Sequence, residues 1–458
     1  METRTLQYLV AAAGGRLVRG DASGSCTGVT TDSRRVKAGN LFIALPGDRF
    51  DGHDFISTVA QAGARAVLVS RACEVPEGCA VVQVDNTRLA LGRLAACYRG
   101  DFQLPVIAVA GSNGKTSTKE LLAAVLRPSL PTLWSEASFN NDIGVPLTLL
   151  RLEAAHRAAV LELGTNHPGE LGPLVQMARP QFGLITSIGR EHLEHFGDLA
   201  GVAREEGALG ELLPACGKLF LYGDSDWSHY IAQRSAAPVV TIGLAAGNDW
   251  RAENITVDST GATFIAAGPI AAACGLYRLN LLGRHHVTNA LLAIAVAAEL
   301  GLAQPAIAQG LAECQPAKGR LQSRDVRGVR LLDDTYNANA DSVSAALSAL
   351  CEMPCSGRRL VVLGDFSELG AHTIAAHTEA GRKAVESRVD VLLAVGEHAG
   401  VTAEAARAAG LAEVHVLRNN AEAGSLLREL ARPGDVVLLK ASRAARLEEI
   451  CAAFSQGA

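Results

Sequence analysis

Short apolar runs alternate with longer amphipathic stretches along most of this chain. From Val106 onward, apolar runs that suit buried strands lie at about 106–111, 158–164, 182–189, 218–223 and 239–243. Each is followed by a stretch with helical periodicity, and this alternation is typical of a mostly parallel sheet covered by helices. From about 250 to 283 the period changes to two residues, which predicts a small antiparallel addition.

A smaller unit precedes this region. Up to about residue 85, strand-like runs such as "NLFIAL", "RAVLVS" and "AVVQV" surround one helical stretch, "DFISTVAQAGA". A helix then leads into the next unit and ends before Pro105, because proline disfavours helix at the residue before it.

A third unit follows, with strand-like runs near residues 329, 359, 389, 413 and 435 that are separated by helical patterns. No G-x-G-x-x-G motif follows its first strand, so the fingerprint of a dinucleotide-binding unit is missing. The sequence therefore predicts an α/β fold with three domains. We expect a small N-terminal α/β domain at 1–85, a central domain with a mostly parallel sheet at 86–315, and a Rossmann-like C-terminal α/β domain at 316–458.

Composition and net charge exclude several classes of protein. The 458 residues are 48% hydrophobic and 19% charged, enough for sizeable cores. The net charge of -5 argues against a general binder of nucleic acids or anionic membranes. We see no run approaching about 18 apolar residues, no signal peptide and no C-x-x-C pair among the ten cysteines. We expect a soluble cytoplasmic protein.

The segment "IAVAGSNGKTSTKELL", residues 107–122, carries the strongest chemical signal. Gly111 and Gly114 allow a tight turn whose amides point at an anion, with Ser112 and Asn113 between them. Lys115 adds a positive charge, and the helix that follows adds its N-terminal dipole. The common phosphate-binding loop would have glycine at position 109, where this chain has valine, so we predict a shortened form of that loop rather than a plain glycine-rich turn.

Two further side chains are expected at the same sheet edge. Glu162 and His192 each follow a strand-like run, and ligands of open α/β sheets bind at the carboxyl ends of the strands. With the Thr116 hydroxyl, Glu162 could hold the magnesium of a nucleotide. His192 is a candidate metal ligand because it should face the same crevice. The alternative for Glu162 is a solvated charge at a strand end. No such position is indicated for the neighbouring His195, which we expect to be structural.

In the third unit, "LLDDTYNANADS" ends the first strand with Asp333 and Asp334. An aspartate at a crevice edge suits a ribose diol. The alternative is helix capping, for which Asp341 or Ser342 would serve the following helix.

Taken together, "GSNGKTSTK", "LELGTN", "HLEHFG" and "GRHHVTNA" resemble, in this order, the motifs of the Mur ligases, ATP-dependent amide-forming enzymes of peptidoglycan precursor synthesis. The stretches "SFNNDIGVPLTLL", "DDTYNANADS" and "VLGDFSELG" are most similar to members that add D-alanyl-D-alanine to UDP-N-acetylmuramoyl-tripeptide. The N-terminal "TDSRRVKAGNLFIALPGDRFDGHDF" resembles a UDP-sugar-binding segment. The resemblance covers nearly the whole chain and implies the same three domains.

The resemblance implies a role for each group of matching residues. For ATP it implies contacts from Gly111, Ser112, Asn113, Gly114, Lys115, Thr116, Ser117, Asn289, Arg320, Asp334, Tyr336 and Asn339. For Mg²⁺ it implies ligands among Thr116, Glu162 and His192. For the UDP-tripeptide and the dipeptide it implies contacts from Ser33, Arg34, Asn140, Asn141, Thr165, Lys440, Ser442 and Arg443. His286 departs from the family, where asparagine is usual.

A second departure concerns the helix after "HLEHFG". Relatives usually carry a carbamylated lysine there as a magnesium ligand, whereas this chain reads "GDLAGVAREEGALGELL". Glu206 takes the aligned position and could supply a similar two-oxygen anion directly, which would make it a catalytic residue beside Lys115, Glu162 and His192. A slip of one residue would give that role to Glu205. The alternative is that both glutamates form a solvated helix face.

The implied reaction activates the terminal carboxylate of the tripeptide, whose third residue is meso-diaminopimelate or lysine, as an acyl phosphate before the dipeptide amine attacks. We expect positioning and electrostatics to supply most of the catalysis, with domain closure assembling the site. The expected partners are small molecules only, without nucleic acid or membrane, and the expected state is a monomer. The alternatives are another ligase of the superfamily, such as a tripeptide or folylpolyglutamate synthetase, or a non-catalytic nucleotide switch.

Overall fold

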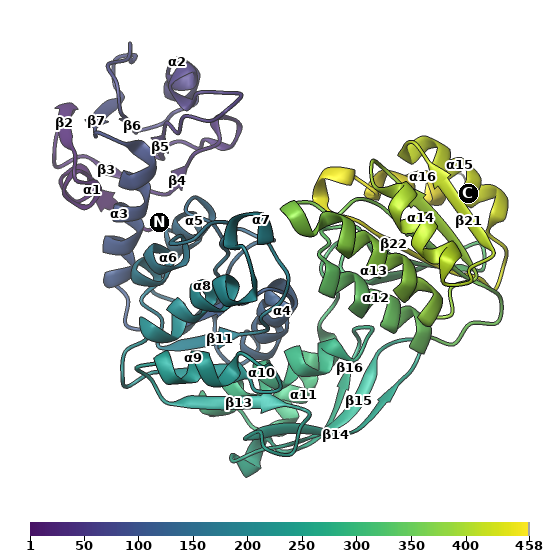
Figure 1. Cartoon of the computed structure of the whole chain (residues 1–458). Coiled ribbons are helices and arrows are strands. Elements are labelled where there is room, and N and C mark those ends of the chain that lie inside the picture. Colours follow the sequence, from purple (N-terminus) through teal and green to yellow (C-terminus); the bar gives the residue numbers. More distant parts are fainter. Residues whose placement is uncertain (457–458) are drawn as a thin grey trace.

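The computed structural model describes residues 1–456. In this part of the chain, three α/β units follow one another, each built on its own sheet (Figure 1). The α/β class, the central mostly parallel sheet and the antiparallel addition to it are confirmed. No helix in the described range has the length and apolarity needed to cross a bilayer.

The N-terminal unit has a five-stranded sheet of order β2-β7-β6-β5-β4, parallel except for β2, and a separate pair of β1 and β3. Its helix α3 packs on α1 and also on α5 and α6 of the central unit, so one hydrophobic core runs across both. The elements are β1 (Arg4–Thr5), α1 (Leu6–Ala13), β2 (Arg16–Arg19), β3 (Ser25–Cys26), β4 (Val29–Thr30), β5 (Leu41–Ile43), α2 (Ile56–Gln61), β6 (Ala66–Val69), β7 (Ala80–Gln83) and α3 (Thr87–Gly100).

The central unit is a nine-stranded sheet of order β16-β15-β14-β13-β12-β11-β8-β10-β9. Its first strand, β8, lies inside the sheet, so the chain changes direction beside it, where open α/β sheets bind ligands. The elements are β8 (Val106–Ala110), α4 (Lys115–Leu126), β9 (Thr132–Trp134), α5 (Gly144–Leu149), β10 (Ala158–Glu162), α6 (Leu171–Ala178), β11 (Phe182–Ile185), α7 (Leu193–Phe196), α8 (Leu199–Glu211), β12 (Lys218–Tyr222), α9 (Ser228–Arg234), β13 (Val239–Gly243), β14 (Trp250–Val257), β15 (Ala262–Ala267), β16 (Gly275–Leu279), α10 (His285–Glu299) and α11 (Gln304–Glu313).

Burial explains the composition of these central elements. All five residues of β8 are buried because helices cover both faces of the sheet, and parallel strands of this kind are apolar throughout. Helix α10 packs on α4 and is buried over most of its length, which accounts for its almost unbroken apolar sequence. It begins at His285, within the stretch "GRHHVTNA".

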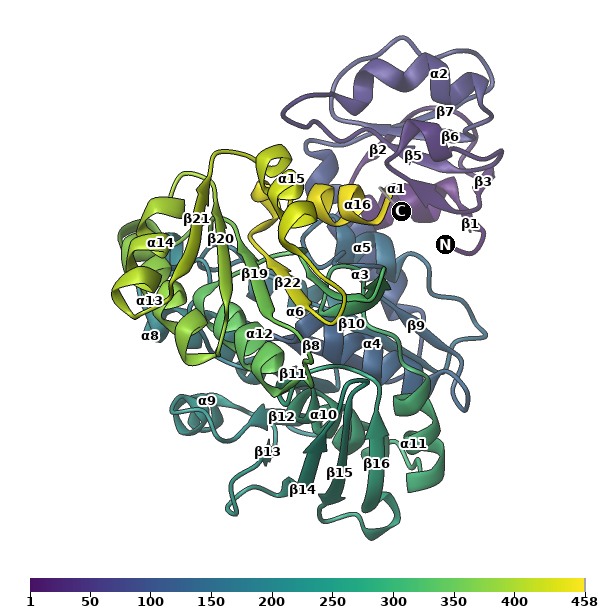
Figure 2. The same cartoon turned by 90° about the vertical axis from the view of Figure 1, so that its right-hand side faces the viewer.

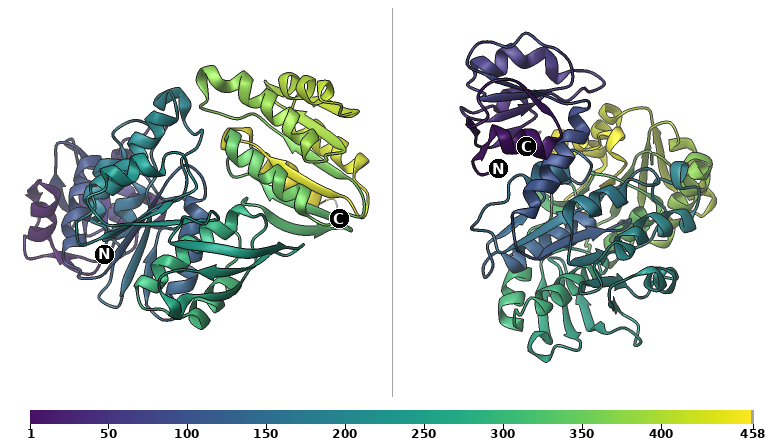
Figure 3. Two further views of the ribbon diagram at one scale, coloured as in Figure 1. Left: turned by 60° about the horizontal axis from the view of Figure 1, so that its bottom comes forward. Right: turned by 90° about the vertical axis from the view of Figure 1, so that its left-hand side faces the viewer.

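The C-terminal unit has a six-stranded sheet of order β17-β18-β22-β19-β20-β21, parallel except for β17, and stands beside the central unit at the end of the molecule away from the N-terminal unit (Figures 1 and 3). The elements are β17 (Gln322–Val326), β18 (Val329–Asp334), α12 (Ala340–Glu352), β19 (Arg359–Leu363), α13 (Thr373–Glu386), β20 (Val391–Val395), α14 (Ala399–Ala408), β21 (Glu413–Leu417), α15 (Asn420–Leu430), β22 (Val436–Lys440) and α16 (Glu448–Gln456). The pattern did not indicate β9 or β17, which are short or polar.

Candidate active site

The phosphate-binding loop lies between β8 and α4, as the sequence indicates. Gly111 and Gly114 have φ angles of 109° and 87°, which favour glycine. A Cβ atom on Gly111 would lie 2.6 Å from Thr186 Oγ1, and one on Gly114 would lie 2.6 Å from Asn289 Oδ1. These close approaches explain both glycines and bring Asn289 of α10 against the loop.

Lys115 begins α4 and its side chain is nearly buried, with 13% exposure. Its Nζ donates to the carbonyl of Gly111, to the carbonyl of Ser112 at 3.3 Å and to Glu191 Oε2 at 3.2 Å. Burial lowers the pKa of Lys115, but the carboxylates of Glu191, Glu206 and Glu162 outweigh it and raise that pKa above its usual value. The lysine therefore stays charged and is held by the protein where a phosphate would bind.

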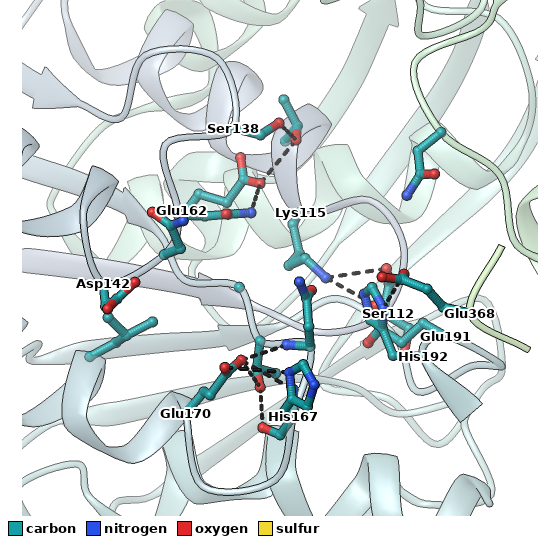
Figure 4. A pocket seen from close by; sticks show the side chains of 18 of the residues that line it. Ser112, Lys115, Ser138, Asp142, Glu162, His167, Glu170, Glu191, His192 and Glu368 are labelled. Carbon is teal, nitrogen blue, oxygen red and sulfur yellow. Dashed lines mark hydrogen bonds and ion pairs between the residues drawn. The ribbon is translucent and has the colours of Figure 1, made fainter. Parts of the chain in front are cut away.

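Glu162 ends β10 next to this loop. Its Oε1 accepts from Thr116 Oγ1 at 3.1 Å and from Asn140 Nδ2 at 2.9 Å. Its Oε2 is buried without a hydrogen-bond partner among the described residues and lies 3.9 Å from Lys119 Nζ. Figure 4 shows Glu162 near Ser138 on one side of Lys115, with Glu191 and His192 on the other. The alternative of a solvated strand-end charge for Glu162 is therefore wrong.

The orientation of helix α8 determines which of its two glutamates faces the phosphate-binding loop. Glu206 is 1% exposed, and its Oε2 accepts from the Gly111 amide at 2.6 Å. Glu205 instead accepts from the amides of Gly169 and Leu171 at 2.7 and 2.8 Å, which fixes the loop before α6. Both glutamates are buried, so a solvated helix face is wrong.

Burial raises the pKa of Glu206 to about 8, with Lys115 opposing this shift and Glu191 adding to it. Within residues 1–456, Glu191 Oε1 and Glu206 Oε1 have no hydrogen-bond partner, as is true of Glu162 Oε2. Two lysines, Lys115 and Lys119, lie against these three buried carboxylates, and Lys119 also pairs with Glu120, so the protein alone does not compensate all of the charges. Carboxylate oxygens are the ligands that Mg²⁺ prefers, so the residues present fit magnesium.

Loops from the central and C-terminal units meet at this site. His192, with φ 47°, places its Nδ1 2.6 Å from Glu368 Oε2. The backbone amide of Arg190, two residues before His192, donates to Asp341 at 2.6 Å, and its guanidinium pairs with Asp341 and Glu379. These charge-assisted contacts hold the C-terminal domain against the loop after β11.

Two more contacts join the domains at the phosphate loop. Arg320 Nη2 donates to Thr116 Oγ1 at 3.4 Å, and its guanidinium lies 4.4 Å from the centre of the Tyr336 ring. Asn339 Nδ2 donates to Asn113 Oδ1 at 3.0 Å. Asn339 also begins α12 as its N-cap, in a capping box with Ser342, so neither Asp341 nor Ser342 is the N-cap that the sequence indicated.

The candidate residues converge on one cleft of about 1250 Å³ between the central and C-terminal units, with α3 and α6 along another wall. Its lining includes Ser112, Asn113, Gly114, Lys115, Thr116, Asn140, Asn141, Glu162, Thr165, His192, Arg320, Tyr336, Asn339, Ser442 and Arg443. His167 also lines it, and its ring centre lies 4.0 Å from that of His195, with the two ring planes tilted by 30°.

Of the described residues, several candidates lie outside this lining. Gly111 and Glu206 lie behind the phosphate loop, Ser117 lies further along α4, and Asn289 lies beside Gly114. Ser33 and Arg34 lie in the N-terminal unit, where the Arg34 side chain is 87% exposed and pairs with Asp32.

Lys440 and Asp334 are bound to each other rather than open to the cleft. Lys440 Nζ donates to Asp334 Oδ2 at 2.6 Å, and Asp334 Oδ1 accepts from the Leu321 amide at 3.2 Å. Burial lowers the pKa of Lys440, and Asp334 counteracts that shift. In this arrangement Lys440 pairs with a buried aspartate and is not among the residues that line the cleft, and its contact with the dipeptide stays a prediction.

Sequence reasoning missed Glu191, Glu368 and Arg190. Glu191 directly precedes His192, so the loop that suggested one ligand contained a second acidic candidate. Glu368 lies within "VLGDFSELG", a stretch used for the resemblance without a role for its glutamate. The partner of Arg190 lies 151 residues further along the chain, and no local pattern indicates such a pair.

Comparisons with known proteins identify the family of this chain. Residues 25–99 match a profile described as "Mur ligase family, catalytic domain", residues 109–297 match "Mur ligase middle domain", and residues 319–443 match "Mur ligase, glutamate ligase domain". The chain is 39% identical over 432 residues to the UDP-N-acetylmuramoyl-tripeptide--D-alanyl-D-alanine ligase of Escherichia coli K12, covering 93% of each chain.

It is also 36% identical over 396 residues to the protein of the same name from Haemophilus influenzae, covering 84% of each chain. A crystal structure of MurF from Acinetobacter baumannii aligns with a TM-score of 0.90 at 33% identity, over 100% of this chain and 99% of that one. The chain belongs to the Mur ligase family.

Proposed function

We propose that this protein is the ATP-dependent, ADP-forming ligase that joins D-alanyl-D-alanine to UDP-N-acetylmuramoyl-tripeptide. The observation that carries the proposal is the single cleft that joins a phosphate loop to strand-end carboxylates and to side chains of the C-terminal domain. The similarity to ligases of that name over 93% of the chain supports the choice of substrates. The product is the UDP-linked pentapeptide precursor of peptidoglycan.

The domains have separate tasks in this proposal. Residues 1–85 hold the UDP end of the long substrate, with Ser33 and Arg34 facing the uridine or its diphosphate. Residues 86–315 hold ATP and the acyl end, and residues 316–458 close the cleft and receive the dipeptide. The reach of the cleft from the phosphate loop to α3 supports this order, because α3 leads directly into the N-terminal sheet.

The chemistry begins with two anions that repel each other. An oxygen of the tripeptide carboxylate attacks the γ-phosphorus of ATP, the bond to the β-phosphate oxygen breaks, and ADP leaves. Lys115 and the amides at the start of α4 stabilise the negative charge of the phosphates, because the amides of residues 111–113 already donate to Glu206 and Ser187 within the protein. Asn140, Asn141 and Thr165 orient the acyl chain. The amine of the dipeptide then attacks the acyl carbon, loses a proton, and expels phosphate.

Magnesium would be held by Glu162 and Thr116, with Glu206 and His192 at a second position. It would neutralise charge on the triphosphate. The unpartnered buried oxygens of the three glutamates support this assignment within the described chain. Before nucleotide binds, Glu191 compensates Lys115, so ATP must displace that ion pair.

Adenine and ribose lie at the domain boundary in this proposal. Asn289 beside Gly114 would bind adenine, with Arg320, Tyr336 and Asn339 near the phosphates and Asp334 near the ribose. Ser442 and Arg443, which line the cleft from the C-terminal side, would face the dipeptide. We propose a monomer in the cytoplasm, where the unpaired state of all ten cysteines suits reducing conditions.

The test is an assay of the purified protein with ATP, the UDP-tripeptide and D-alanyl-D-alanine. Phosphate release should require both co-substrates, and mass spectrometry should find the UDP-pentapeptide. Release with another amino acid or peptide alone would favour a different ligase of the superfamily. Nucleotide binding without turnover would favour a switch.

A further inference from the structure

A cluster of metal-ligating side chains lies in the C-terminal domain, and none of its three residues lines the described cleft. Asp365 follows β19, His377 lies on α13, and His398 precedes α14 as its N-cap. Helices α13 and α14 pack against each other, and Figure 2 shows them on the same side of this sheet. One ligand atom from each residue lies within 4.8 Å of the other two.

The spacing of these atoms suits a small four-coordinate ion. Asp365 Oδ1 lies 3.4 Å from His398 Nδ1 and 3.8 Å from His377 Nε2. Bonds of about 2.0–2.1 Å to a tetrahedral Zn²⁺ place its ligand atoms roughly 3.3 Å apart. The two distances from Asp365 are therefore within about 0.5 Å of that spacing, and the two histidine nitrogens lie within 4.8 Å of each other.

Contacts around the cluster orient each ligand. His377 Nδ1 lies 2.8 Å from the Thr373 carbonyl, to which it donates, so the unprotonated Nε2 faces Asp365. Metal-binding histidines usually donate their second ring nitrogen to a carbonyl or carboxylate in this way. The carboxylate of Asp365 is fixed by the amides of Glu397 and His398 at 2.8 and 2.9 Å.

Two further features indicate a built site rather than a simple helix cap. His398 Nδ1 is buried, yet it makes no hydrogen bond within the part of the chain that the structure describes. Gly396, with φ 113°, lets the turn approach the carboxylate, since a Cβ there would lie 2.2 Å from Asp365 Oδ2.

We propose that Asp365, His377 and His398 form a binding site for a divalent transition metal, with Zn²⁺ as the best match. Two imidazoles and one carboxylate are a ligand set that suits Zn²⁺, and a fourth position remains for water. The side chains of His398 and Asp365 are 27% and 29% exposed, so the cluster lies near the surface, although the Nδ1 atom of His398 is itself buried. In binding, His377 Nε2 exchanges its weak 3.3 Å hydrogen bond from the Phe366 amide for the metal.

The site is connected to the active-site cleft through one loop. The Asp365 carbonyl accepts from the Ser442 amide and hydroxyl at 3.0 and 2.8 Å. Ser442, Ser367 and Glu368 all line the cleft, and Ser367 Oγ lies 2.8 Å from Ser442 Oγ. A bound ion would therefore stiffen the wall that carries Glu368, the partner of His192.

Calorimetry on the metal-free full-length protein tests the site, with Zn²⁺ added in the presence of saturating Mg²⁺ to block the glutamate cluster. Wild type should bind one more Zn²⁺ than His398→Ala, or bind it at least about tenfold more tightly, because even residues behind a ligand change affinity by that much. His415→Ala, which removes a half-buried histidine of the same domain, should bind like wild type.

Co²⁺ supplies a second measurement. Wild type and His415→Ala should show the intense visible absorption of four-coordinate cobalt, and His398→Ala should lose it. Asp365→Asn should also lose it, with a lower melting temperature because the cap of α14 weakens. Equal Zn²⁺ stoichiometry and affinity in wild type and His398→Ala would overturn the proposal, as would identical cobalt spectra.

Discussion

Replacing Glu206 with glutamine removes a buried negative charge behind the phosphate loop while keeping the shape of the side chain. An amide oxygen can still accept from the Gly111 amide, which lies 2.6 Å from Glu206 Oε2. Because burial raises the pKa of this glutamate to about 8, its charge is unfavourable in the protein alone. We therefore expect the free energy of unfolding of Glu206→Gln to equal or exceed that of wild type.

Turnover should respond in the opposite direction. A unit charge acting over about 5 Å at an effective dielectric constant of about 20 contributes about 3 kcal/mol. If this charge stabilises the cation that accompanies ATP, Glu206→Gln should lower kcat by roughly 10²-fold. The affinity for Mn²⁺ in the presence of ADP should fall as well.

A coupled assay of ADP release and a Mn²⁺ titration measure these two effects. Removing dissolved carbon dioxide should leave wild-type activity unchanged, and bicarbonate should not rescue Glu206→Ala. Glu206→Lys should be more active than Glu206→Ala, and the additional activity should depend on bicarbonate.

Glu205→Gln is the matched control. Glu205 accepts two short backbone hydrogen bonds, from the amides of Gly169 and Leu171. Loss of its charge should lower the free energy of unfolding by about 1.5–3 kcal/mol, with a much smaller loss of kcat than in Glu206→Gln. Full turnover and unchanged Mn²⁺ affinity in Glu206→Gln would refute the reasoning.

Four other changes have expected outcomes. Lys115→Ala should lower kcat by at least about 10²–10³-fold, with a lower melting temperature because a buried ion pair is lost; wild-type turnover would contradict the phosphate-loop assignment. Arg34→Ala should raise KM for the UDP-tripeptide far more than KM for ATP, and equal effects would count against the N-terminal UDP site. Asp334→Ala should weaken ADP binding in calorimetry and should also destabilise the protein by about 3–5 kcal/mol, because Lys440 loses its buried partner. Burial holds the pKa of His286 well below its usual value, so below about pH 6.5 the unfolded chain binds a proton at this histidine that the folded chain does not bind. The free energy of unfolding therefore falls by up to about 1.4 kcal/mol for each pH unit of acidification. In urea titrations, His286→Asn should lose less of this free energy between pH 6.5 and 5 than wild type.

The fold and the centre of the site could be predicted because local patterns carry them. The apolar run of β8, the two glycines and Lys115 define strand, turn and helix within a few residues. Glu162 could be placed beside them because strand ends of a parallel sheet share one edge. These features depend on sequence neighbours and on one rule of sheet geometry.

Features that depend on packing could not be predicted. The sequence alone does not distinguish Glu205 from Glu206. The rotation of α8 about its axis directs Glu205 to the loop before α6 and Glu206 to Gly111. The resemblance predicts that Lys440 contacts the substrate. The register of β22 beside β18 instead places it opposite Asp334. These pairings join residues that lie 36, 95 and 106 positions apart along the chain, and no short window contains them.

The central claim is that ATP activates the tripeptide carboxylate and that the dipeptide amine then takes the acyl group. Turnover with ¹⁸O in that carboxylate tests it directly, with the released phosphate analysed by mass spectrometry. We predict one ¹⁸O atom in each phosphate, formed only when ATP, UDP-tripeptide and D-alanyl-D-alanine are all present. Unlabelled phosphate, or phosphate released from ATP alone at the same rate, would contradict the claim.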